Sequence, residues 1–275
     1  MSNLALIFRM DVESAVRSKW YWAYVLIVLT SIGSIFAAGV ADSRVMGFTG
    51  LTRTLLIFIQ ACNLILPIVI LVSTVRTLVK EKETNVFEYL LSYPISLGEY
   101  YWGKALSRLV IVAMPLIFGM AFAVAFSLIK TKAVPWELIG LYTALLVANT
   151  VYFVGLSFLL SSVVKTQEMG LGLALAIWLV VIALIDVVLL GMMIKALVPE
   201  EVIYAIALVN PIQVFKMAAV SLFDPVLSVI GPAAYFILDL FGNRAFIVYS
   251  LCYLIASGLG FFAVGFWRFC RKDLL

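Results

Sequence analysis

Few side chains in this sequence are suited to chemistry, and those that are stand apart within long apolar runs. There is no histidine, which excludes imidazole-based triads, HExxH zinc sites and imidazole proton shuttles. The three cysteines, Cys62, Cys252 and Cys270, are far apart and form no C-x-x-C pair. No phosphate-binding G-x-x-x-x-G-K-[ST] motif occurs. We therefore expect no catalytic site and no bound cofactor on this chain.

Asp186 is the only carboxylate that lies well inside one of the apolar runs. An isolated charge at the centre of a bilayer costs about 2.5–3.5 kcal/mol on insertion scales, so such a residue is a candidate for function. Substrate binding, proton transfer and a structural role all remain open for it. Met192 and Met193 could supply soft sulfur ligands to copper. Because methionines at a helix end usually fill apolar space, we assign no metal site to them.

A second set of polar side chains, Gln60, Asn63 and Thr74, follows a narrow stripe of one apolar run, with Pro67 on the same side. Such a stripe can line a translocation path. The alternative is hydrogen bonding between helices, which amides and hydroxyls in lipid also provide. Together with Asp186, these three residues form the candidate translocation path.

The elements that position these residues are predicted to be transmembrane helices. Hydrophobic residues make up 65% of the 275 residues and charged residues 12%, against roughly 45–50% and 25% in soluble domains. The excess apolar surface must face lipid, which about 20 apolar residues can cross as a helix. A net charge of +4 without a basic block gives no indication of a nucleic-acid partner. Six stretches are long enough to span: 20–40, 55–75, 105–128, 138–164, 170–194 and 245–267.

The basic residues predict the orientation of these spans. With both termini in the cytoplasm, twelve of the 19 lysines and arginines lie on the inner side and seven on the outer side, as the positive-inside rule favours. We expect a single transmembrane domain over residues 1–275, crossing the cytoplasmic (inner) membrane several times. Residues 1–19 carry too many charges for a signal peptide and predict an interfacial helix, whose apolar side Asp11 interrupts.

The segment 196–244 is apolar but is broken by four prolines, and no piece between the breaks reaches 20 residues. Short apolar helices of this kind predict re-entrant or interfacial segments on the extracytoplasmic side. The alternative is a seventh span near 226–241, which would place the basic C-terminus outside. In the last span, Ala256 and Gly260 form a small-xxx-small pair that permits close helix approach, within the chain or across a dimer.

Residues 77–104, between the second and third spans, would be cytoplasmic. Asn85, with Glu88 three residues later, resembles a capping box, and Pro94 ends the short helix that would begin there. The helix shows Val86, Phe87, Leu90 and Leu91. An apolar patch flanked by charges is typical of a docking surface. A juxtamembrane helix packed under its own bundle would show the same pattern, and the residues alone do not decide between the two.

The segment 83–104 resembles the coupling-helix region of ABC-2 type permeases. It contains, in the order of the family, the acidic Glu83, the apolar run 87–91, the run Ser92-Tyr93-Pro94-Ile95-Ser96 and Gly103-Lys104. Thr84-Asn85 stands where the family commonly has Gly-Thr. The run 161–178 is similar to the family's turn between the fourth and fifth spans. The run 210–242 is similar to the NosY-like permeases of nitrous-oxide-reductase maturation transporters.

This resemblance implies an all-α, six-span ABC-2 permease of the type V exporter-like fold. It further implies a homodimer that works with two copies of a separate ATPase, which would bind ATP and Mg. The NosY-like resemblance implies export of copper or a sulfur species for metalloenzyme maturation, with a periplasmic accessory protein. The alternative is a channel or an assembly scaffold without ATP coupling. The residues expected at the ATPase-coupling interface are Glu83, Asn85, Val86, Phe87, Glu88, Leu90, Leu91, Tyr93 and Pro94.

Overall fold

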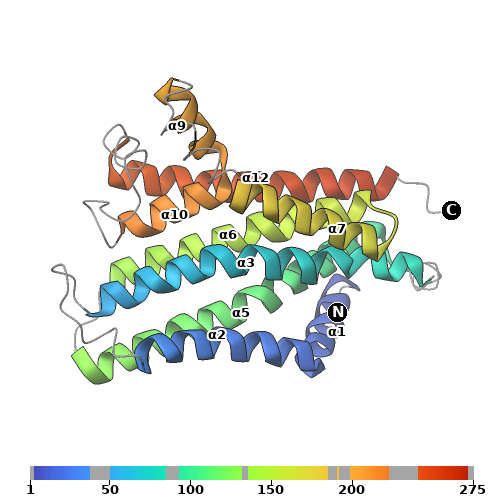
Figure 1. Cartoon of the computed structure of the whole chain (residues 1–275). Helices are drawn as coiled ribbons and strands as arrows, with labels where there is room; N and C mark the ends of the chain where they lie inside the picture. The colour runs from blue at the N-terminus through green and yellow to red at the C-terminus, as the bar shows by residue number, and fades with distance from the viewer. Residues whose placement is uncertain are drawn as a thin grey trace.

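The computed structural model describes a bundle of helices (Figure 1). It covers residues 3–37, 50–84, 93–131, 136–184, 191, 199–222 and 241–271, and no strand occurs within these ranges. The helices are α1 (Asn3–Arg17), α2 (Lys19–Ala37), α3 (Gly50–Glu83), α5 (Leu97–Thr131), α6 (Trp136–Val163), α7 (Gln167–Trp178), the π-helix η2 (Leu179–Leu184), α9 (Glu200–Val209), α10 (Pro211–Ser221) and α12 (Asn243–Arg271).

Four helices in the described part of the chain are long and apolar enough to cross a membrane. They correspond to the second, third, fourth and sixth predicted stretches. The first and fifth stretches hold α2 and α7, whose apolar parts are shorter, and both stretches continue beyond the described residues. The count of six spans therefore stays a prediction. The seventh span considered near 226–241 lies almost wholly outside the described residues. The four candidate spans are Asn63–Glu81, Leu97–Phe122, Ile139–Val163 and Asn243–Arg271.

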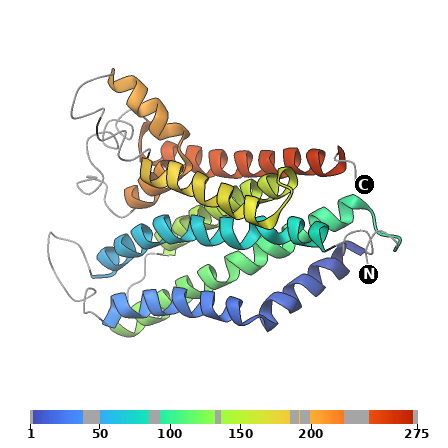
Figure 2. The same cartoon turned by 45° about the vertical axis from the view of Figure 1, so that its right-hand side comes forward.

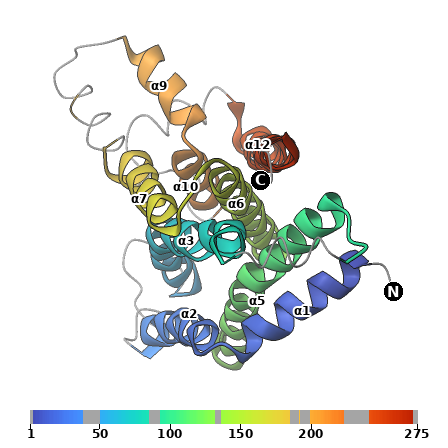
Figure 3. The same ribbon diagram turned by 90° about the vertical axis from the view of Figure 1, so that its right-hand side faces the viewer.

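Helix α6 lies at the centre of the bundle, in contact with α3, α5, α10 and α12 (Figure 3). Its closest neighbour is α12, where Gly155 faces Gly258. A Cβ atom on Gly258 would lie 2.8 Å from the carbonyl oxygen of Val151, so no side chain fits between the two backbones. The hydroxyl of Tyr101, on α5, donates to the carbonyl of Phe262 on α12 at 3.0 Å. These contacts join α5, α6 and α12 into one packed unit.

The glycine that permits this contact is not the one that the small-residue pattern predicts. Ala256 and Gly260 are exposed, and a Cβ on Gly260 would meet nothing within 4 Å in the described structure. Gly260 therefore makes no close helix contact within the described ranges, and the role of the pair across a dimer stays a prediction. In α7, by contrast, Gly170 packs on α3, where its Cβ would lie 3.4 Å from the Val75 side chain.

Two short helices, α9 and α10, meet at Asn210 and Pro211. Proline suits the first position of a helix, and the Asn210 side chain caps α10 by accepting from the amide of Ile212 at 3.0 Å. The Asn210 amide also donates to the carbonyl of Val181 in η2 at 3.0 Å. From α12, the Tyr249 hydroxyl donates to the last turn of α9. This corner fastens α10 inside the bundle, whereas α9 extends away from it (Figure 2).

The bundle has two ends, which we name by residues. The Glu83 end is where α3 ends and α5 begins, and the Trp136 end is where α6 begins (Figure 1). Helix α12 finishes at the Glu83 end, where Phe269 stacks on Tyr100 with ring centroids 6.1 Å apart. Helix α1 also begins there, because Asn3 donates to the carbonyl of Pro94 at 2.9 Å.

The α6–α12 contact predicts that Gly258→Val lowers the stability of the bundle. The added side chain must displace backbone, and forcing extra volume into a packed interior costs about 1–3 kcal/mol or more. Gly260→Val on the same helix is the matched control, because the space beside Gly260 is open. Thermal unfolding of the two purified variants in detergent checks this. Equal unfolding midpoints for both would contradict the contact.

Candidate functional site

The predicted coupling segment is only partly within the described residues. Asn85, Val86, Phe87, Glu88, Leu90 and Leu91 lie outside them, as do Asp186, Met192 and Met193. Glu83, Tyr93 and Pro94 are described and stand at the two stems of the segment 85–92. These stems are the end of α3 and the start of α5. Their contacts show what the segment is attached to.

At the α3 stem, Glu83 binds the first residue of α7. Its carboxylate oxygens accept from the Gln167 backbone amide at 2.9 Å and from the Gln167 side-chain amide at 2.6 Å. A negative charge is favourable at a helix N-terminus, where amides are unpaired and the dipole is positive. Thr166 caps the same helix by accepting from the Met169 amide at 3.2 Å. Glu83 thus fastens α7 to the end of α3.

A cleft of about 510 Å³ opens beside this contact between α3 and α7. It contains one cationic and two carboxylate side chains, so its surface is mixed in charge. Arg76 is exposed at this cleft, whereas the residue before it in α3, Val75, is buried. The lining residues are Arg76, Glu83, Thr166, Gln167, Glu168 and Leu171.

At the α5 stem, Ser96 and Glu99 form a capping box. The Glu99 carboxylate accepts from the Ser96 amide at 3.0 Å, and the Ser96 hydroxyl accepts from the Glu99 amide at 3.2 Å. Asn3 of α1 donates to the Pro94 carbonyl and, at 3.4 Å, to the same Glu99 carboxylate. The sequence pattern predicts a capping box only at Asn85 and Glu88. The box at Ser96 and Glu99 was not predicted, although the S-x-x-E spacing before an apolar run marks it.

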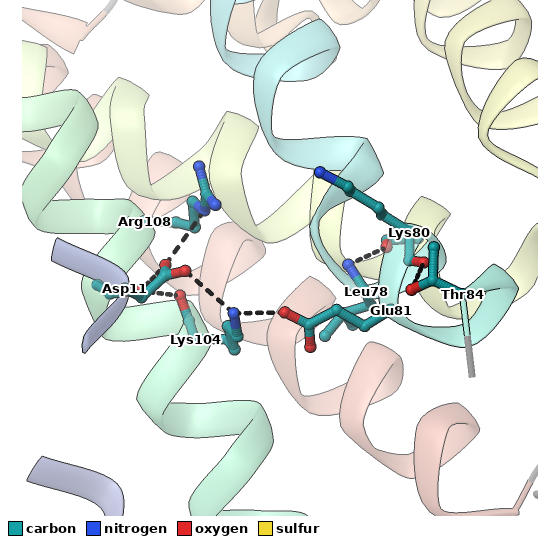
Figure 4. Close-up of polar contacts among 9 residues, drawn as sticks. Asp11, Leu78, Lys80, Glu81, Thr84, Lys104 and Arg108 are labelled. Carbon is teal, nitrogen blue, oxygen red and sulfur yellow. Dashed lines mark hydrogen bonds and ion pairs between the residues drawn. The ribbon is translucent and has the colours of Figure 1, made fainter. Parts of the chain in front are cut away.

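A cluster of charged side chains lies between α1, α3 and α5 (Figure 4). Lys104 on α5 is at its centre, with Nζ 3.0 Å from Asp11 on α1 and 2.7 Å from Glu81 on α3. The other Asp11 oxygen accepts from the Ser107 hydroxyl at 2.5 Å and lies 3.4 Å from Nε of Arg108. Two carboxylates therefore balance two cations in a largely buried space. We call these five residues the Lys104 cluster.

The Lys104 cluster explains the position of Asp11. In the sequence, this residue interrupts the apolar side of the predicted interfacial helix, whereas in the structure it is buried, with 8% of its side chain exposed. Burial by itself raises the pKa of Asp11. The charges of Arg108 and Lys104 and the Ser107 hydroxyl outweigh burial and hold that pKa below its ordinary value. Asp11 is therefore ionised at neutral pH.

The described part of the candidate translocation path is buried and polar. Asn63 and Thr74 are 9% and 0% exposed, and their side-chain oxygens have no hydrogen-bond partner in the described structure. Asn149 on α6 shares this condition. Gln60 lies on α3, but its side chain is outside the described residues. Because buried polar atoms are usually satisfied, these unpaired oxygens are candidates for contact with something outside the chain.

A family model described as "ABC-2 family transporter protein" matches residues 5–274, which is nearly all of the chain that forms these stems and spans. The chain belongs to the ABC-2 transporter family. It is similar to a protein named "Probable ABC transporter permease protein NosY" from Stutzerimonas stutzeri. The two are 24% identical over 230 residues, which cover 82% of this chain and 83% of the relative. A protein of the same name from Pseudomonas aeruginosa is 24% identical over 225 residues, covering 79% and 82%.

This ABC-2 family member is expected to lose order at the start of α7 when Glu83 is replaced by Gln. The neutral amide is a weaker acceptor than a carboxylate at a helix N-terminus. Hydrogen exchange at the first turn of α7 should rise about two- to fivefold, as expected for the loss of one ordinary hydrogen bond. Glu137→Gln, at the exposed start of α6, is the control and should leave exchange at the start of α7 unchanged. Equal exchange in both variants would contradict the role of Glu83.

The lowered pKa of Asp11 predicts the pH range in which it stabilises the protein. A carboxyl group with a lowered pKa in the folded state stabilises above its unfolded pKa and loses that effect as the pH falls through the folded value. The stability difference between wild type and Asp11→Asn, about 1–3 kcal/mol, should therefore be constant from about pH 8 to about pH 5. It should shrink only as the pH falls below 3.8. Thermal unfolding of both proteins across pH measures this, and a loss already at pH 6 would be inconsistent with it.

Proposed function

We propose that this ABC transporter membrane subunit couples ATP hydrolysis on a separate ATPase to export, and that the ATPase docks on the segment 85–92. The observation that carries the proposal is the anchoring of both stems of this segment. Glu83 is bonded to α7, and Pro94 and Glu99 are bonded to α1. A displacement of the segment would therefore be passed to several helices at once.

The composition of the segment supports docking. Phe87, Leu90 and Leu91 are apolar, with Glu81, Glu83 and Glu88 close by in sequence. Buried apolar anchors surrounded by polar residues are typical of protein interfaces. On ATP binding, closure of the ATPase would shift the docked segment and move the spans between two arrangements. ATP and Mg would be held by the ATPase alone.

The proposed assembly is a dimer of this chain with two ATPase subunits. Two copies of this chain would bind two ATPase subunits in the inner membrane, with the Glu83 end and both termini in the cytoplasm. In support, α1 begins and α12 finishes at the Glu83 end, and the last turn of α12 carries Arg268 and Arg271. A periplasmic accessory protein would meet the Trp136 end.

The path of the substrate is proposed to follow α3. The unpaired side-chain oxygens of Asn63 and Thr74 support this. Gln60 and Asp186 would extend the path across the membrane. Copper or a sulfur species for metalloenzyme maturation is proposed as the substrate, as the resemblance of the run 210–242 to NosY-like permeases implies.

Co-purification with the ATPase encoded by a neighbouring gene tests the docking proposal. Wild type should form a stable complex, and the double variant Phe87→Asp with Leu91→Asp should lose it, because two buried charges replace apolar anchors. The control is Trp136→Asp with Phe241→Asp, which places the same charges at exposed aromatic positions of the Trp136 end and should retain the complex. A complex retained by the Phe87 and Leu91 variant would overturn the proposal.

A further inference from the structure

Helix α1 is bonded to the α5 stem of the segment 85–92 and, through Lys104 of α5, is linked to the α3 stem. Its first residue, Asn3, bonds to Pro94 and Glu99 at the α5 stem. Two turns later, Asp11 binds Lys104 on α5, and the same ammonium group binds Glu81, two residues before the end of α3. Among the described residues, Lys104 of α5 thus joins α1 and the α3 stem at one point.

The packing between α1 and α5 is direct, so this attachment is stiff. Gly103 lies against α1, and a Cβ at that position would be 3.0 Å from the Ile7 side chain and 3.2 Å from the Leu4 carbonyl oxygen. The next residue along α5 is Lys104 itself. Backbone contact at one position and an ion pair at the next fix both the spacing and the rotation of α1 on α5.

The charges of the Lys104 cluster depend on one another. Lys104 is 12% exposed and Glu81 20% exposed, so neither is well solvated. If Asp11 lost its charge, Glu81 would be the only carboxylate left in the cluster to face Lys104 and Arg108. A partly buried cation without its partner is strongly unfavourable. The cluster therefore favours one arrangement of the two stems and α1 over displaced ones.

Glu13 provides a contrast on the same helix. It is 49% exposed and pairs with Arg9, one turn earlier in α1, at 2.7 Å. Its pair lies within α1 and connects it to no other helix. A carboxylate on α1 is therefore expected to matter for the stems only at position 11.

We propose that Asp11 is a positioning residue of the coupling device, which through Lys104 and Glu81 makes α1 and both stems move as one body. This inference rests on the proposed function. The segment 85–92 would supply the contact with the ATPase. The Lys104 cluster would prevent one stem from moving without the other when that segment is displaced.

The first test measures ATP hydrolysis by the assembled complex in lipid nanodiscs. Asp11→Asn should still bind the ATPase, because the segment 85–92 is unchanged. In the wild-type complex, the ATPase should hydrolyse ATP at a different rate from the free ATPase. Asp11→Asn should make this difference at least about fivefold smaller, which corresponds to the lower end of ordinary coupling free energies. Glu13→Gln is the control and should match wild type. A wild-type rate in Asp11→Asn would overturn the inference.

The second test measures position and does not need the ATPase. Spin labels are placed at Ser14→Cys on α1 and Tyr93→Cys at the α5 stem, with Cys62, Cys252 and Cys270 replaced by serine. Wild type should give one narrow distance distribution, which Asp11→Asn should broaden and Asp11→Glu, which keeps the charge, should restore. A purely structural role would change the unfolding temperature and leave the distances of the folded protein unaltered. A distance distribution in Asp11→Asn that is as narrow as in wild type would overturn the inference.

The two tests separate this inference from the proposed function. If wild type binds no ATPase, the docking proposal fails, and the label distances still decide whether Asp11 positions α1. If Asp11→Asn yields no folded protein, Glu81→Gln replaces it in both tests, with the second label moved to Lys80→Cys. That variant removes the contact of Lys104 with α3 and leaves Asp11 of α1 bound to Lys104, Ser107 and Arg108. Unchanged rates and distances in Glu81→Gln would overturn the inference in the same way.

Discussion

The requirement that a poorly solvated charge be paired organises the Glu83 end of this protein. Lys104 can remain between three helices only because Asp11 and Glu81 both reach it. Meeting this requirement brings together residues from α1, α3 and α5, which are far apart in the chain. The neighbouring contacts of Asn3 with Pro94 and of Glu83 with Gln167 extend the same polar layer from α1 to α7.

The two sides of the bundle are held together by different interactions. Helices α6 and α12 meet backbone to backbone at Gly155 and Gly258, where dispersion and exclusion of side chains leave one arrangement. Helix α7 packs on α3 through Gly170 and is also held by hydrogen bonds at each end. At its start, Glu83 accepts two hydrogen bonds from Gln167, and at its end the Trp178 indole donates to the Leu64 carbonyl at 3.2 Å. Directional bonds of this kind can be exchanged for others, whereas a close backbone contact cannot shift without opening a void.

Several features of the fold and the candidate site could be predicted from the sequence. Apolar runs of about 20 residues predicted the four candidate spans, because length and composition are local properties. The motif order in 83–104 indicated the ABC-2 family, which the family model confirms. The break at Asn210 and Pro211 was also readable, since proline and a capping side chain act within one turn. The short helix and the docking role expected for the segment 85–92 stay predictions, because this segment lies outside the described residues.

What the sequence by itself determined is where helices form and which of them can enter lipid. Which faces meet was decided only by the tertiary structure. In the sequence, Asp11 only interrupts the apolar side of the N-terminal helix. Its partner Lys104 is 93 residues away, and no periodic pattern relates residues at that distance. Gly260 matched a small-residue motif, yet the contact uses Gly258. Helical periodicity defines the faces of each helix, and the rotation of one helix against another depends on volumes and charges contributed by the whole bundle.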